Sequence, residues 1–132
     1  MKQKIKVMLV EDNPEYREVI NLALEDEPDI DLISQFGTSE IALRSLQDMS
    51  TRIEPDLVLL DLRLPGMDGL DSLPYFLRAL PDAKVMILTQ SDDESDVLRA
   101  IAHGAAGYLL KSSRLDQITD GIRTIMDGGA PI

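Results

Sequence analysis

The strongest constraint on the fold is an alternation of short apolar runs with segments that have the spacing of amphipathic helices. The apolar runs cover residues 5–10, 30–34, 57–60, 85–88 and 107–110. They are rich in valine, isoleucine and leucine and lack a clean polar alternation, which is typical of strands buried on both faces of a parallel sheet. The pattern therefore predicts five strands of a parallel sheet.

The segments between and after these runs predict five helices, over residues 14–25, 39–49, 70–80, 96–103 and 115–126. Asn13 and Pro14 suit the start of the first helix. Gly104 suits the end of the fourth helix, and Gly128 and Gly129 suit the end of the fifth. Alternating strands and helices of this length predict a flavodoxin-like, doubly wound α/β fold with right-handed crossovers and strand order 2-1-3-4-5. We expect residues 1–132 to form one domain.

Polar residues follow four of the five predicted strands. Glu11 and Asp12 follow the first strand, Asp61 the third and Lys111 the fifth, and Thr89 ends the fourth. Ligands of open α/β sheets bind outside the carboxyl ends of the strands, near the switch in strand order. Strands 1 and 3 are neighbours at that switch, so we expect the three carboxylates to meet at one edge of the sheet.

Such a cluster has a specific chemistry. Three neighbouring carboxylates repel one another unless a cation lies between them, and Mg²⁺ favours carboxylate, water and phosphate oxygens as ligands. Lys111 adds a positive charge suited to a carboxylate or phosphoryl oxygen. Thr89 adds a hydroxyl that can donate a hydrogen bond to a phosphoryl oxygen. The residues together predict a site for a divalent metal ion and a phosphoryl group.

Each residue alone also has a structural interpretation. Glu11 and Asp12 can stabilise the N-terminus of the following helix, and Asp61 can open a turn. A threonine often ends a strand, and a single lysine is usually solvated. The coincidence of all of them at the strand ends favours the functional interpretation.

Other polar residues are weaker candidates. His103, the one histidine of the chain, has no partner at a metal-ligand spacing. We expect it at the solvated C-terminal end of a helix. Asp92, Asp93 and Glu94 are expected to favour the N-terminus of the same helix.

The formal net charge of −11 bears on the partners of the chain, because a body so acidic repels nucleic acids and anionic membranes. The chain has no cysteine, so disulfides and thiolate metal sites are excluded. Its start does not have the pattern of a secretory signal, and it has no apolar run long enough to span a bilayer. We therefore expect a cytoplasmic protein that interacts with no membrane.

The ordered motifs resemble the receiver domain of two-component response regulators over essentially the whole chain. The motifs are VEDNP at 10–14, DLRLPGMDG at 61–69, ILT at 87–89 and GAAGYLLK at 104–111. The stretches at 61–70 and 125–131 most resemble the NarL/LuxR type. In proteins of that type a helix-turn-helix DNA-binding domain follows, so we expect contact with DNA only through an output domain outside these 132 residues. We favour a truncated sequence over a natural single-domain regulator.

The resemblance implies a role for each site residue. Asp61 would accept a phosphoryl group from a phosphohistidine of a sensor histidine kinase. Glu11, Asp12, Asp61 and the backbone carbonyl of Arg63 would bind Mg²⁺. Lys111 would offset charge on the transferred group. The domain would be a signalling switch that catalyses its own phosphorylation and hydrolysis, rather than an enzyme acting on a separate substrate.

The resemblance also implies a route by which the signal leaves the site. Thr89 would turn toward the phosphoryl oxygens, and Tyr108 would turn inward in response. The change would alter the surface of the fourth helix, fifth strand and fifth helix, and would favour dimerisation or release of an output domain that controls transcription. Dimers would form through the fourth helix, fifth strand and fifth helix, or through the first and fifth helices.

Two residues depart from the common receiver pattern. Ser112 follows Lys111 where many receivers have proline, and Gln90 follows Thr89 where a small residue is usual. The first departure bears on the placement of the lysine, and the second can crowd the site and slow phosphoryl entry or water attack.

Three alternatives remain open at this point. One is a degenerate receiver that binds partners without phosphorylation. Another is an aspartyl phosphatase of the haloacid dehalogenase class, although Arg63 occupies the position where such enzymes carry a second aspartate. The third is a flavodoxin-like FMN carrier, although its acidic first loop would repel a phosphate.

Overall fold

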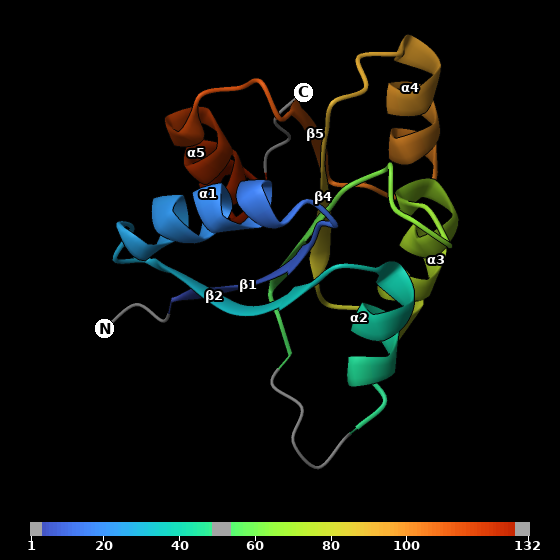
Figure 1. Cartoon of the computed structure of the whole chain (residues 1–132), viewed down its shortest axis with the longest axis horizontal. Helices are drawn as coiled ribbons and strands as arrows, with labels where there is room; N and C mark the ends of the chain where they lie inside the picture. Colours follow the sequence, from blue (N-terminus) through green and yellow to red (C-terminus); the bar gives the residue numbers. More distant parts are fainter. Residues whose placement is uncertain (1–3, 49–53, 129–132) are drawn as a thin grey trace.

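The computed structural model of the chain describes residues 4–48 and 54–128 and confirms the alternation of strands and helices (Figure 1). The elements in chain order are β1 (Ile5–Val10), α1 (Pro14–Glu25), β2 (Ile30–Phe36), α2 (Ser39–Ser45), β3 (Leu57–Leu60), α3 (Gly69–Ala79), β4 (Lys84–Thr89), α4 (Glu94–Ala102), β5 (Gly107–Leu110) and α5 (Leu115–Met126). The strands form one parallel sheet in the order β2-β1-β3-β4-β5, as predicted. This order places β1 beside β3 at the switch point, where the sequence predicts the site.

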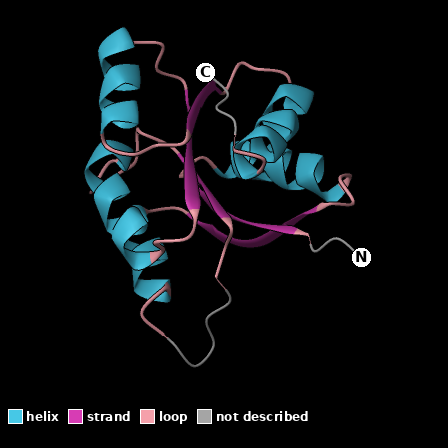
Figure 2. Ribbon diagram, turned by 180° about the vertical axis from the view of Figure 1, so that it is seen from behind, coloured by secondary structure: helices cyan, strands magenta, loops and turns pink. Residues whose placement is uncertain are grey.

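The helices cover both faces of the sheet. In Figures 1 and 2, α1 and α5 lie on one face and α2, α3 and α4 on the other. Within residues 4–48 and 54–128, every helix is too short or too polar to cross a membrane.

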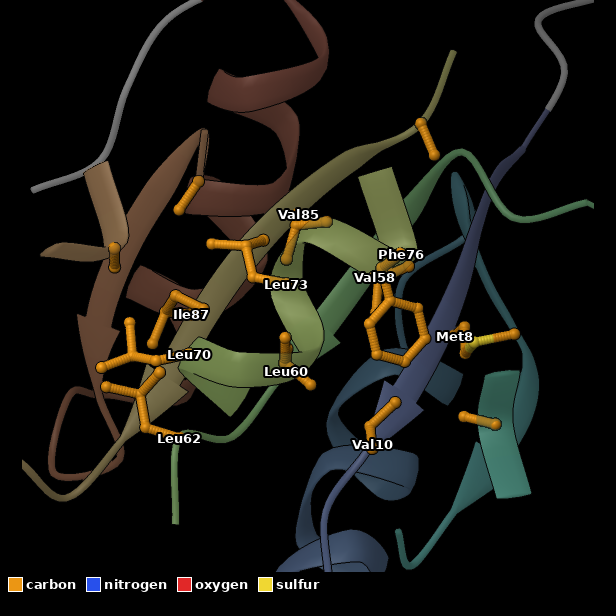
Figure 3. Close-up of a cluster of buried hydrophobic side chains, with 14 of the residues drawn as sticks. Met8, Val10, Val58, Leu60, Leu62, Leu70, Leu73, Phe76, Val85 and Ile87 are labelled. Carbon is orange, nitrogen blue, oxygen red and sulfur yellow. The ribbon is translucent and has the colours of Figure 1, made fainter. Parts of the chain in front are cut away.

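Successive strand residues point to opposite faces, which divides the core into two clusters. The cluster on the side of α2, α3 and α4 is built around Phe76 and includes Met8, Val10, Val58, Leu60, Val85 and Ile87 (Figure 3). The cluster on the side of α1 and α5 includes Val7, Leu9, Leu57, Leu59, Met86 and Leu88. Burial on both faces explains why these strands read as continuous apolar runs.

The element boundaries differ from prediction mainly where local hydrogen bonds change. The helix predicted over 39–49 ends at Ser45, because the amides of Leu46 and Gln47 bond to carbonyls three residues back, which tightens the chain into a turn. The fourth helix begins earlier than predicted because Asp93 caps it and accepts a hydrogen bond from the Ser95 amide. Two expected positions, Met49 in α2 and Gly129 after α5, lie outside the described residues.

Two glycines in the β3–α3 segment bring α3 close to the strand end. Gly66 has φ +73°, in the left-handed region that favours glycine. A Cβ at Gly69 would lie 2.2 Å from the backbone oxygen of Asp61, so only glycine permits this approach. The packing of α3 therefore constrains the backbone of Asp61.

Candidate functional site

The structure brings the polar strand ends together at the carboxyl edge of the sheet. Glu11 and Asp12 follow β1, Asp61 follows β3 and Lys111 follows β5. One carboxylate oxygen from each of the three acids lies within 4.8 Å of the others. The acids therefore converge as the strand order predicts.

Two of the three acids are deeply buried. Glu11 is 1% exposed and Asp61 is 4% exposed, whereas Asp12 is exposed to solvent. Burial raises the pKa of Glu11, and the nearby charge of Asp61 adds to this effect. The Glu11 carboxylate also accepts a hydrogen bond of 2.9 Å from the Asn13 amide, which opposes the rise. The site thus holds buried negative charge that attracts a cation.

Lys111 supplies a cation from the protein itself. Its Nζ lies 2.9 Å from Asp61 Oδ2 and also pairs with Glu11 Oε1. Burial alone would lower the pKa of Lys111, but its hydrogen bonds to Glu11 and Asp61 outweigh that effect and raise the pKa. The ammonium group therefore stays protonated beside the two buried carboxylates.

A hollow of about 240 Å³ opens over these residues. It is lined by Glu11, Asp12, Asn13, Asp61, Arg63, Gln90 and Lys111. The Arg63 amide donates to Asp61 Oδ1 at 3.2 Å, so both oxygens of this carboxylate accept hydrogen bonds. A small anionic group that enters the hollow would meet the carboxylate of Asp61 and the ammonium of Lys111.

The two predicted switch residues lie beyond this first group. Thr89 is fully buried at the end of β4, and its hydroxyl accepts from the Ser91 amide at 3.4 Å. Tyr108 is 5% exposed, and its hydroxyl donates to the Ser91 carbonyl oxygen at 2.6 Å. In this structure Tyr108 therefore points inward and is tied to the β4–α4 loop.

The two residues that depart from the receiver pattern both lie next to Lys111. Gln90 lines the hollow described above and also a second hollow of about 320 Å³, which Ser112 and Tyr16 border as well. Lys111 reaches Asp61 although serine follows it, and the peptide bonds of the described residues are all trans. Gln90 is exposed and lines both hollows; that it crowds the site and slows phosphoryl entry or water attack stays a prediction.

Sequence reasoning missed two side chains near the site, Tyr16 and Asp96. Tyr16 on α1 lies with its ring centroid 4.9 Å from Lys111 Nζ. Asp96 accepts from the Arg63 guanidinium at 3.1 Å and from the Ser91 hydroxyl at 2.7 Å, which joins α4 to the β3–α3 loop. No motif marks these contacts, since the partners lie on different elements. His103, by contrast, is the exposed C-cap of α4, as expected.

Comparisons with known proteins agree with this arrangement. The model of the "Response regulator receiver domain" family matches residues 7–123. The nitrate/nitrite response regulator protein NarP of Escherichia coli is 38% identical over 118 residues, which are 89% of this chain and 53% of NarP. The transcriptional regulatory protein LiaR of Bacillus subtilis is 34% identical over 94% of this chain and 57% of its own length. The chain thus spans a little over half the length of these relatives.

Solved structures with more than a quarter of their residues identical share the fold closely. A LuxR-family two-component response regulator from Aurantimonas sp. has a TM-score of 0.87 and 27% identity, covering 98% of this chain and 90% of its own. The signal receiver domain of the putative response regulator NarL from Mycobacterium tuberculosis has a TM-score of 0.84 and 28% identity, with 96% of this chain and 99% of that chain covered.

Proposed function

This chain belongs to the response regulator receiver family and is a receiver domain of a two-component system, and on that premise we propose that Asp61 is the phosphoryl acceptor. The observation that carries the proposal is the position of its carboxylate, which lies among two further acids and accepts a hydrogen bond from Lys111. Because the chain belongs to the receiver family, we no longer consider the phosphatase and flavin-carrier alternatives.

The proposed donor is a phosphohistidine of a sensor kinase, because receiver domains pair with histidine kinases. An Asp61 oxygen attacks phosphorus, the phosphorus–nitrogen bond breaks, and the imidazole keeps the bonding electrons. Lys111 lies where its charge offsets the negative charge on the transferred group. The product is an acyl phosphate on Asp61.

The cation proposed for this site is Mg²⁺. A triad of acids such as this is typical of the magnesium site of receivers, and its all-oxygen donor set fits a hard divalent ion. Glu11, Asp12 and Asp61 would hold the ion, with the backbone carbonyl of Arg63 as a further ligand. When bound, Mg²⁺ would neutralise negative charge on the acids and the phosphoryl oxygens.

Intact-mass measurement after incubation with acetyl phosphate and Mg²⁺ tests the acceptor. The wild-type chain should gain one phosphoryl group as its main product. This product should be absent from Asp61→Asn, because an amide is not a nucleophile of this kind. Asp82→Asn, a change at an exposed aspartate before β4, is the matched control and should be labelled fully. Full labelling of Asp61→Asn would refute the assignment, and an unlabelled wild-type chain would favour the degenerate receiver.

The signal is proposed to leave through Thr89 and Tyr108. Both are buried, and both form hydrogen bonds to Ser91 in the β4–α4 loop. A phosphoryl group at Asp61 would draw the Thr89 hydroxyl toward its oxygens and shift the population of this loop. Thr89→Ala should therefore keep labelling of Asp61 while losing the phosphorylation-dependent change in hydrogen exchange across residues 94–120. An unchanged response in this variant would argue against the relay.

The proposed output is transcription, since the relatives named above are regulators, one of them named as transcriptional. DNA contact would belong to a helix-turn-helix segment outside these residues, because a net charge of −11 opposes DNA binding. Specific binding of the 132-residue chain to DNA in a gel-shift assay would contradict this.

Two surfaces suit the proposed dimer. Leu98 on α4 is 62% exposed, and Leu22 on α1 is 53% exposed. Sedimentation of the phosphorylated chain separates the two: Leu98→Glu should abolish a dimer through α4, β5 and α5, and Leu22→Glu a dimer through α1 and α5.

A further inference from the structure

The ammonium of Lys111 has a third neighbour besides Glu11 and Asp61. Its Nζ lies 4.9 Å from the ring centroid of Tyr16, in the first turns of α1. We propose that Tyr16 is a positioning residue for phosphoryl transfer, and that its ring face holds the Lys111 ammonium against the Asp61 carboxylate. The inference rests on the function proposed above, and it adds a residue outside the set of acids, lysine and threonine.

The position of the Tyr16 ring is determined by α1 and the core. The side chain of Asn13 caps α1 and accepts a hydrogen bond of 3.1 Å from the Tyr16 amide. The ring itself packs against the buried apolar cluster on the side of α1 and α5. Tyr16 therefore presents a fixed surface to the lysine, whose own four-carbon stem is flexible.

The ring face, rather than the hydroxyl, carries the interaction. The Tyr16 hydroxyl is buried and has no hydrogen-bond partner among the described residues, so it adds no polar contact that could hold Lys111. The face of an aromatic ring attracts an ammonium through its quadrupole when the two are within about 6 Å, and the attraction strengthens where water is excluded. The Lys111 side chain is only 11% exposed, so it meets this condition.

The contact matters because the Lys111 ammonium has more than one possible partner. Its ammonium pairs with both Glu11 and Asp61, and a divalent cation among the acids would compete for the same carboxylate oxygens. A lysine repelled by that cation could leave toward solvent through the hollow that Lys111 and Tyr16 both line. The ring keeps the ammonium beside Asp61 at the moment when the phosphoryl group arrives.

Side-chain NMR of Lys111 tests the contact directly. The ring current of Tyr16 should shift the Lys111 Hε resonances upfield in the wild-type chain and in Tyr16→Phe, and the shift should vanish in Tyr16→Leu. Tyr75→Leu is a matched control, because Tyr75 on α3 has Arg78 5.4 Å from its ring centroid, away from the site. An unshifted Lys111 in the wild-type chain would overturn the contact, whatever the outcome of phosphorylation.

Rates of labelling by acetyl phosphate with Mg²⁺ test the positioning role. Tyr16→Leu should slow labelling about tenfold, as loss of a desolvated cation–π contact predicts, and Tyr16→Phe should restore the rate to within about twofold. In a Lys111→Met background, Tyr16→Leu should cause no further loss, because the ring then has no ammonium to hold. An equal loss in both backgrounds would show that Tyr16 acts only by packing and would overturn the proposal.

One further replacement covers the case in which Tyr16→Leu does not fold. Pentafluorophenylalanine at position 16 keeps the shape of the ring but reverses its quadrupole, so it should slow labelling about as much as Tyr16→Leu would. A rate equal to that of Tyr16→Phe would refute the proposal. If the wild-type chain itself takes no phosphoryl group, the proposed function fails, whereas a normal wild-type rate that is insensitive to the ring refutes only the role of Tyr16.

Discussion

The acidic triad should destabilise the fold in the absence of a divalent cation, and Asp12→Asn measures this. One carboxylate oxygen of Asp12 lies within 4.8 Å of one oxygen of Glu11 and one of Asp61. Two like charges at that separation repel by about 0.9 kcal/mol in bulk water and by about 3.5 kcal/mol at the effective dielectric of a protein surface. Lys111 cancels part of the repulsion, because it pairs with both buried acids. We therefore expect the free energy of unfolding to rise by about 1 to 3 kcal/mol in Asp12→Asn.

Urea denaturation in the presence of EDTA is the assay, with unfolding followed by circular dichroism. Asp82→Asn removes one negative charge from an exposed turn away from the triad and controls for the change in net charge. Mg²⁺ at ten times its Kd should raise the free energy of unfolding of the wild-type chain by about 1.4 kcal/mol, and that of Asp12→Asn by less. If Asp12→Asn is no more stable than Asp82→Asn in EDTA, the view that the three carboxylates repel one another is refuted.

Three further predictions concern other parts of the structure. Gly69→Ala should lower the free energy of unfolding by about 1 to 3 kcal/mol in urea denaturation, because its Cβ would collide with the Asp61 carbonyl oxygen at 2.2 Å. Ultraviolet titration should give Tyr16 a pKa of about 12 and Tyr108 a pKa above the usual value of 10, because burial raises the pKa of both phenols. A phenol with a raised pKa stabilises the fold below pH 10, and we expect this contribution to disappear as the pH rises toward 12. Arg123→Met should lower the free energy of unfolding by about 1 kcal/mol, less at high salt, because it removes the salt bridges from α5 to the α1–β2 loop.

Each of these predictions has a matched control within the chain. Gly37→Ala should be tolerated, because its Cβ would meet only the flexible end of Arg17 at 3.2 Å. Tyr16→Phe should remove the step near pH 12 from the titration and leave the other tyrosines unchanged. Arg114→Met breaks a pair whose two side chains are both largely exposed, so it should leave the unfolding curve nearly unchanged. If a control variant changed the measured quantity more than the variant it is paired with, the corresponding argument would be contradicted.

Much of the fold could be read from the sequence because its signals are local. Three strands, β1, β3 and β5, and two helices, α1 and α5, have the predicted bounds. The apolar runs of a doubly covered sheet and the amphipathic spacing of helices are both properties of a few consecutive residues. The ends of α2 and α4 were less predictable, because they depend on individual hydrogen bonds at Leu46 and Asp93.

The sequence by itself also located the acids and the lysine of the site. In a parallel sheet the carboxyl ends of all strands lie at one edge. Because β1 and β3 are neighbours, the three acids that follow them meet there, and Lys111 follows β5 at the same edge. The amino-acid sequence was thus enough to predict that Glu11, Asp12, Asp61 and Lys111 lie at the candidate site.

The tertiary structure alone decided which side chains surround that site. Lys111 meets Tyr16 of α1, and Arg63 meets Asp96 of α4, although neither pair shares a motif or an element. The structure also shows that Asp12 is exposed while Glu11 and Asp61 are buried. The physical reason is that such contacts depend on how helices pack on the sheet and on which rotamers the packing permits, and local periodicity carries no information about either.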